Sequence, residues 1–195
     1  FSAVAAGTKA TLAQTDSEVT LEAAADNAAL GTYSGMTFTA TKTGDKFSVK
    51  GSTPAYTLTP KETEGKIIVS GDTITDGAVF TLATAKGSAT AAQYKIGDLE
   101  LEPSAANATA TYTSASASWT VASGTANDTV TMTLTGGSND TAKEFKINSK
   151  TFSTKAATDT VTYTKGEDTG ADTYALGSSA STAADVTLSI TGATG

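Results

Sequence analysis

The chain contains no cysteine, no histidine and no arginine among its 195 residues. The lack of thiol and imidazole groups excludes cysteine nucleophiles, histidine bases and zinc sites built on either residue. Without guanidinium groups the chain cannot clamp a phosphate or a guanine in a bidentate manner, and a pI near 4.5 means that it repels polyanions. We therefore expect no nucleic-acid partner and no cofactor.

Long apolar stretches are also absent. No run approaches the roughly 18 residues that a membrane-spanning helix needs, so no membrane span is expected. The chain has a single Trp and lacks a nucleophile elbow, a phosphate-binding glycine loop and any imidazole. These gaps indicate a protein that is not an enzyme, and we assign no catalytic, cofactor-binding or metal-ligating residues from sequence.

Threonine makes up about one residue in five, and much of it alternates with apolar residues. Alternation with a period of two predicts strands that bury one face and expose the other. Three of the runs lead through a polar turn that contains glycine to an aromatic and an aliphatic residue, which predicts three β-hairpins. The four runs are TFTATKT at 37–43, VFTLAT at 79–84, TVTMTLT at 129–135 and DVTLSIT at 185–191.

One segment of the chain is repeated. Eight of the nineteen positions in KIGDLELEPSAANATATYT, residues 95–113, recur without a gap in KINSKTFSTKAATDTVTYT, residues 146–164. A repeated segment is usually a repeated supersecondary unit. We therefore expect an all-β protein of repeated, antiparallel, β-sandwich-like modules of about 50 residues, in which neighbouring modules either share a core or form slim stacked β modules.

The modules are expected at 36–83, 84–134 and 135–195, after a lead-in segment at 1–35. Within the lead-in, the Ala-rich stretch Ser17 to Leu30 is compatible with a short helix, and a strand at Glu18 to Leu21 is the competing interpretation. The strand at 185–191 must pair with something: the last module's own sheet, which we favour, the rest of a longer parent protein, or a neighbouring molecule.

Acidic residues gather in turns, where carboxylate and carbonyl oxygens can hold calcium. Asp and Asn are also ordinary turn residues, and this second interpretation is favoured because no calcium-binding repeat is matched. Trp119 is flanked by small residues and is expected to anchor a core. The acidic turn residues are Asp72, Asp76, Asp128, Asp140, Glu167, Asp168 and Asp172, and N-glycosylation triplets begin at Asn107, Asn127 and Asn139.

The composition, rich in Thr, Ala, Gly, Asp and Lys, resembles the outer variable domains of bacterial flagellins. The phrases YKIGDLELE and FKINSKTFS beside TYT strands carry the resemblance over most of residues 36–195. Repeat modules of bacterial surface filaments and adhesins are similar in composition. The resemblance implies an extracellular, cell-surface module of a filament, flagellin-like or pilus-like, that associates with itself or with neighbouring subunits. An adhesin-type module that recognises a host glycan or protein, stiffened by calcium, is the alternative.

Overall fold

A computed structural model describes residues 8–13, 18–51, 55–61, 65–86, 93–135, 143–154, 159–167, 170–178 and 187–189. These residues form β-strands almost throughout, with one short 3-10 helix at Ser114–Ser116. The all-β expectation is confirmed. The strands are β1 (Lys9–Ala13), β2 (Glu18–Glu22), β3 (Ala28–Tyr33), β4 (Met36–Ala40), β5 (Lys46–Lys50), β6 (Ala55–Thr59), β7 (Lys66–Ser70), β8 (Val79–Leu82), β9 (Gln93–Ile96), β10 (Leu99–Pro103), β11 (Ala108–Thr113), β12 (Ser118–Ala122), β13 (Thr129–Leu134), β14 (Lys143–Ile147), β15 (Lys150–Thr154), β16 (Asp159–Thr164), β17 (Thr173–Ser178) and β18 (Thr187–Ser189).

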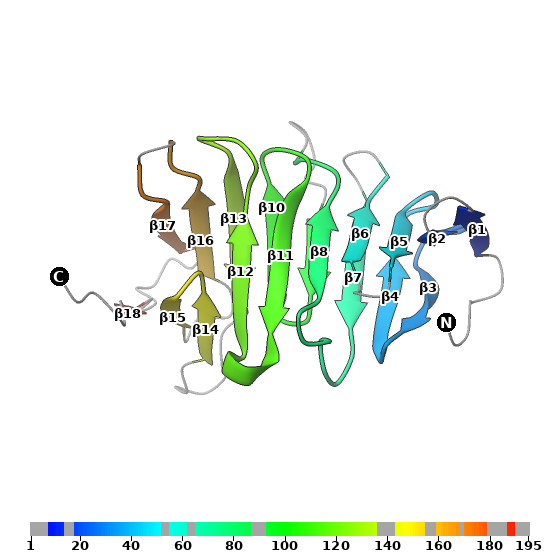
Figure 1. The fold of residues 1–195 in the computed structure, drawn as a ribbon, viewed down its shortest axis with the longest axis horizontal. Helices are drawn as coiled ribbons and strands as arrows, with labels where there is room; N and C mark the ends of the chain where they lie inside the picture. The colour runs from blue at the N-terminus through cyan, green and yellow to red at the C-terminus, as the bar shows by residue number, and fades with distance from the viewer. Residues whose placement is uncertain are drawn as a thin grey trace.

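The strands form two stacked sheets in which the spatial order follows the chain order (Figure 1). The ten-stranded sheet runs β1-β2-β5-β6-β8-β11-β12-β14-β15-β18. The eight-stranded sheet, in the same direction, runs β3-β4-β7-β9-β10-β13-β16-β17. The chain thus passes back and forth between the sheets and adds one or two strands at each pass, so that β1 lies at one end and β17 and β18 at the other.

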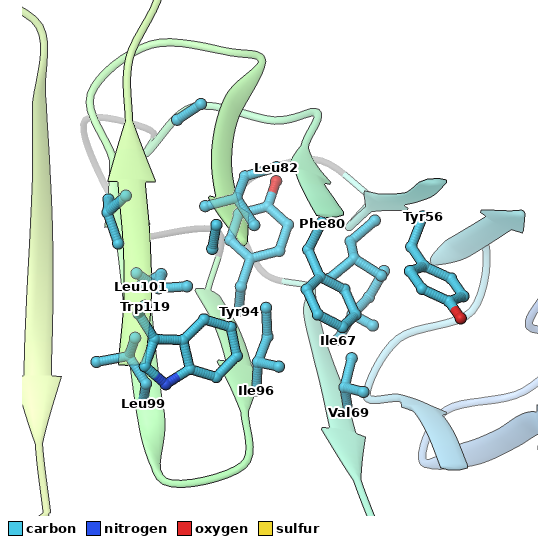
Figure 2. Close-up of a cluster of buried hydrophobic side chains, with 14 of the residues drawn as sticks. Tyr56, Ile67, Val69, Phe80, Leu82, Tyr94, Ile96, Leu99, Leu101 and Trp119 are labelled. Carbon is cyan, nitrogen blue, oxygen red and sulfur yellow. The ribbon is translucent and has the colours of Figure 1, made fainter. Parts of the chain in front are cut away.

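One hydrophobic core fills the space between the sheets. Among the described residues the buried apolar side chains form a single cluster from Leu21 in β2 to Tyr163 in β16, and it crosses the module boundaries expected at 83/84 and 134/135. A row of aromatic rings lies in it on the ten-stranded sheet: Phe47, Tyr56, Phe80 and Trp119, with ring centroids 6.0, 5.1 and 6.4 Å apart in turn. Figure 2 shows Phe80 between Tyr56 and Trp119. The three modules remain a prediction, and whatever their limits they share this core.

The alternating runs form strands as predicted. In β4 and β13 every second residue is buried, and the threonines between them occupy the outer faces. Hydroxyl groups of neighbouring strands form hydrogen bonds on the outer faces. The hydroxyl oxygens of Thr20 in β2 and Ser48 in β5 lie 2.6 Å apart, and those of Thr131 in β13 and Thr162 in β16 lie 3.3 Å apart. Threonine suits this position because it is β-branched and its hydroxyl finds a cross-strand partner.

The three predicted hairpins are wrong. The strand pairs β4 and β5, β8 and β9, and β13 and β14 each lie in opposite sheets and do not pair with each other. A residue with positive φ serves a sheet-to-sheet crossing as well as a hairpin, so a polar turn that contains glycine does not distinguish the two. Gly44, with φ 90°, lies in the first of these crossings, and its N–H binds the carbonyl of Ala23 in the preceding crossing at 2.8 Å.

The two repeated segments adopt the same local structure in opposite sheets. Each begins at the end of a strand, makes a two-residue turn, forms a second strand and then passes to the other sheet. The first copy goes from β9 and β10 in the eight-stranded sheet to β11, and the second goes from β14 and β15 in the ten-stranded sheet to β16. The shared Tyr lies opposite an aromatic residue in both copies: Tyr112 opposite Trp119, and Tyr163 opposite Tyr174.

Two further expectations are corrected. The helix considered for Ser17 to Leu30 is absent from the described residues of that stretch: Glu18–Glu22 forms β2, as the competing interpretation held, and Ala28–Tyr33 forms β3, which neither interpretation predicted. The sheets are mixed, not purely antiparallel. Among the described residues, three pairings are parallel: β6 with β8, β7 with β9, and β12 with β14. In each case the chain forms a single strand in the other sheet before it returns, so the returning strand runs parallel to the one that left, whereas a pass of two strands returns it antiparallel, as in β2 with β5.

The last predicted strand pairs within the chain. β18 lies antiparallel to β15, with Leu188 opposite Phe152, so the favoured interpretation of 185–191 is confirmed for residues 187–189. The rest of the predicted strand, residues 185, 186, 190 and 191, lies outside the described residues.

Candidate functional site

The ten-stranded sheet has one narrow join, between β12 and β14. Only two residue pairs form there, Ser118 with Lys146 and Trp119 with Ile147, whereas the eight-stranded sheet stays fully paired through β10, β13 and β16. Asn148, in the turn after β14, extends the join. Its amide oxygen accepts a hydrogen bond from Val121 N at 2.7 Å, and its amide nitrogen donates to Val121 O at 2.7 Å. We call this join the seam.

A cleft of about 530 Å³ opens between the sheets beside the seam. It lies at the ends of strands on one long edge of the sandwich, away from β1 and β17, where the turn between β9 and β10 and the turn between β11 and β12 meet the start of β14. We call it the end cleft. Its lining combines aromatic and aliphatic side chains from the core with polar groups from the turns: Gly71, Asp72, Thr73, Ile74, Ile96, Gly97, Asp98, Leu99, Tyr112, Ser114, Ala117, Trp119, Lys143, Glu144, Phe145 and Lys146.

The rings of the end cleft come from neighbouring strands of one sheet. Tyr112 in β11 and Trp119 in β12 have centroids 5.0 Å apart, and Phe145 follows in β14. Trp119 is 8% exposed and Phe145 6%, while Tyr112 is half-buried. Figure 2 shows Trp119 beside Leu99 and Ile96, at the side of the core away from Tyr56. The expectation that Trp119 anchors the core is confirmed, and the part of it that remains accessible borders the cleft.

Charged groups of both signs border the end cleft. The Lys143 ammonium pairs with the Asp98 carboxylate across the two sheets and lies 5.4 Å from the Phe145 ring centroid. Both side chains of the ion pair are well exposed, at 38% and 65%, so solvent screens the attraction and the pair adds little stability. The pair can therefore open without a large cost, which would uncover the Phe145 ring.

Asp76 organises the loop on one side of the end cleft. Its carboxylate accepts a hydrogen bond from Ser114 N at 2.7 Å, and this donation lowers the pKa of Asp76. The contact ties the segment between β7 and β8 to the turn between β11 and β12, and both segments line the cleft. Asp72, four residues earlier, is exposed at the cleft and has no part in that contact. The structure therefore separates the two acids that the sequence placed together.

The other acidic turns also satisfy their carboxylates with protein groups. Asp172 accepts hydrogen bonds from Gly166 N at 3.0 Å and from the Tyr163 hydroxyl at 3.1 Å, and the Gly166 amide is the main cause of its lowered pKa. Asp128 accepts from the Ser123 hydroxyl at 3.2 Å, and Glu167 is exposed. Within the described ranges no three carboxylates approach closely enough to hold a metal ion. Asp140 and Asp168 lie outside those ranges.

Two asparagines of the glycosylation triplets, Asn107 and Asn127, lie in sheet-to-sheet crossings. Asn107 and Asn127 have φ values of 67° and 66°, which Asn tolerates better than most residues. Each donates its backbone N–H across the crossing, Asn107 to Leu82 O at 2.8 Å and Asn127 to Lys165 O at 2.9 Å. The backbone conformation accounts for both residues, and Asn139 lies outside the described part of the chain.

A smaller pocket of about 420 Å³ lies along the seam. Its lining is mainly hydroxyl groups and two lysines: Ser116, Ser118, Trp119, Thr120, Lys146, Ser149, Lys150 and Thr151. The Lys150 ammonium lies 5.2 Å from the centroid of Tyr174, a ring that does not line the pocket. Sequence reasoning singled out neither pocket, because both depend on strands that are distant in the chain.

Comparison with known proteins yields no relatives: no family model, no curated protein and no solved structure matches this chain. No described helix has the length and apolar character that crossing a membrane requires.

Proposed function

We propose that this chain is a structural module of an extracellular bacterial surface filament, flagellin-like or pilus-like, and acts by β-sheet assembly and surface presentation. The observation that supports this most directly is that both sheets follow the chain order around one core. A sandwich of this kind can be extended by adding strands at its ends. We call the resulting pair of stacked sheets the slab, and within it each strand satisfies the backbone hydrogen bonds of the next.

The outer faces of the slab suit exposure to water. Lys66 and Lys95, on β7 and β9, both pair with Glu100 on β10, at 3.0 and 3.9 Å. Hydroxyl pairs cover other parts of the outer faces, and a net charge of -7 discourages non-specific association between molecules. A hydrophilic surface over a paired backbone is a reasonable way to present a stable exterior.

Contact with a neighbouring subunit is proposed at the end formed by β17. Leu176 is 44% exposed, although its partner in the register, Val161, is completely buried. It is the one large apolar side chain in the described residues that is so exposed. β17 pairs with β16, and no described strand pairs with its other edge. An apolar edge strand is a template for strand addition, and natural proteins that avoid such pairing place a charge there.

Light scattering and negative-stain imaging of the purified protein at increasing concentration would test this proposal. We expect concentration-dependent end-to-end association, and Leu176→Lys should abolish it. Thr120→Lys adds the same charge to an exposed position in the middle of the ten-stranded sheet and should leave association intact. A wild-type protein that stays monomeric at all concentrations, or two variants that behave alike, would contradict assembly through this end.

A further inference from the structure

The end cleft has the composition of a small-molecule site. Binding sites for small molecules are concave, have volumes of roughly 300 to 1,000 Å³, and combine apolar walls with a few converging polar groups. The end cleft, at about 530 Å³, has Tyr112, Trp119 and Phe145 on its apolar side and Asp72, Asp98 and Lys143 among its polar groups. We propose that it binds a neutral saccharide of one or two rings.

The aromatic side of the cleft favours a ligand with an apolar face. Tyr112 and Trp119 are held 5.0 Å apart by their paired positions on β11 and β12, so their common edge is fixed before any ligand arrives. A preformed surface costs little entropy to occupy. Aromatic rings bury large apolar areas, and the C–H face of a sugar ring is flat enough to pack against them.

The polar side of the cleft favours hydroxyl groups as partners. Asp98 and Asp72 supply acceptors, Lys143 and Ser114 supply donors, and Glu144 and Lys146 add one group of each kind. A saccharide hydroxyl both donates and accepts, so it can bond with either kind. The lining holds three carboxylates and two ammonium groups. A phosphate or sulfate would meet more negative charge than positive, and this balance favours a neutral ligand.

The Lys143–Asp98 ion pair at the cleft can rearrange when a ligand binds. The Lys143–Asp98 pair spans the two sheets at the cleft and is exposed enough to rearrange. A sugar hydroxyl that replaces one partner of the pair would keep a hydrogen bond at each charged group while the ring takes the place of the ammonium above Phe145. Opening of the ion pair therefore exposes more of the cleft surface, including the Phe145 ring, than is accessible while the pair is formed.

Trp119 provides the measurement, because it is the only Trp of the chain and lines the cleft. We would titrate the full chain with glucose, maltose, cellobiose, lactose and diacetylchitobiose, and with sodium sulfate, while following tryptophan fluorescence and saturation-transfer NMR. At least one of the sugars should give a saturable change at millimolar concentration, and sulfate should give none. Saturation by sulfate with no response to any sugar would overturn the proposal, as would no response to any of the probes.

Three exposed variants locate the binding. Asp98→Ala and Asp72→Ala should each weaken the sugar response at least several-fold, whereas Glu167→Ala, an exposed acid that does not line the cleft, should leave it unchanged. Equal affinity in all three variants would place any binding elsewhere and overturn the proposal. Association through Leu176 should be the same in these variants, so failure of this site and failure of the proposed assembly can be told apart.

Discussion

The side-chain amide of Asn148 acts as one more peptide group of β14 and pairs with Val121. It accepts from Val121 N and donates to Val121 O, each at 2.7 Å, as a strand residue would do with its backbone. The backbone of Asn148 has φ 50° in the two-residue turn before β15, and its own N–H binds Trp119 O at 2.9 Å. One residue thus makes three of the hydrogen bonds that hold the seam together.

Replacing Asn148 with Asp should destabilise the protein. Aspartate keeps the size of the side chain and tolerates positive φ, but it puts a carboxylate oxygen against Val121 O in place of a donor. We expect a loss of about 2 kcal/mol in the free energy of unfolding, which a urea titration would measure. Asn127→Asp is the matched control, since Asn127 also has positive φ and is exposed, and it should cost much less. Equal losses in the two variants would contradict the role of the amide.

Two buried tyrosines should respond differently to removal of the hydroxyl group. The Tyr94 hydroxyl accepts from Thr84 N at 2.7 Å and donates to Thr84 O at 2.8 Å. The Tyr56 hydroxyl is buried with no hydrogen-bond partner among the described residues. Tyr94→Phe should therefore cost about 1 to 2 kcal/mol, and Tyr56→Phe should be neutral or stabilising. Thermal melting of both variants checks this, and a larger loss for Tyr56→Phe would refute it.

Ionisation of Tyr94 and Tyr163 should destabilise the protein at high pH. Burial raises the pKa of Tyr94 from 10.0 to about 12, and burial also raises the pKa of Tyr163 to about 12. A group whose pKa is higher in the folded protein stabilises it fully below its unfolded pKa. That stabilisation is lost as the pH rises from about 10 toward 12.

Unfolding free energies between pH 9 and pH 12 would show the effect. The stability of the wild type should fall over this range by up to roughly 1.4 kcal/mol per pH unit for each of the two groups. Tyr94→Phe should show a shallower fall, because one of the two groups no longer ionises. If the variant and the wild type lose stability in parallel, Tyr94 is not responsible.

Gly65 should not tolerate a side chain. A Cβ there would overlap the Asp45 carboxylate and come within 2.9 Å of Lys61 N. Asp45 cannot move aside easily, because it is fully buried and accepts hydrogen bonds from Thr41 N, Lys42 N and Lys61 N. Gly65→Ala should cost at least about 2 kcal/mol, as overpacked positions do.

Gly124→Ala is the control for that substitution. Gly124 lies in another crossing, and a Cβ there would meet nothing within 4 Å. This variant should be neutral or slightly stabilising in the same denaturant titration, because alanine lowers the entropy of the unfolded chain. A Gly65→Ala protein as stable as Gly124→Ala would show that the Asp45 loop is not packed as described.

The strands were predictable from sequence because their burial is one-sided. Phe38 and Met132 lie in runs where every second residue is apolar, and a period of two has no other common cause. The partners of these strands were not predictable. A polar turn with a positive-φ residue leads to the adjacent strand in one case and to the other sheet in another, and the choice depends on which apolar faces meet across the core.

The repeat was informative about local structure and silent about placement. The repeat predicted a common unit, and each copy does form a turn, a strand and then a strand in the other sheet. The amino-acid sequence does not indicate that the two copies lie in opposite sheets. The seam and the end cleft were missed for a related reason. The role of Asn148 depends on its contact with Val121, which the sequence does not show. Asp98 and Lys143 are 45 residues apart in the chain, so their pairing is not visible in the sequence either.

Calorimetric unfolding of the full chain tests most directly whether the protein folds as one sandwich around one shared core. A shared core predicts a single transition whose calorimetric enthalpy equals its van't Hoff enthalpy, with Trp119 fluorescence and far-UV circular dichroism changing at the same temperature. Two or three separate transitions, each with the enthalpy of a unit of about 50 residues, would contradict the account.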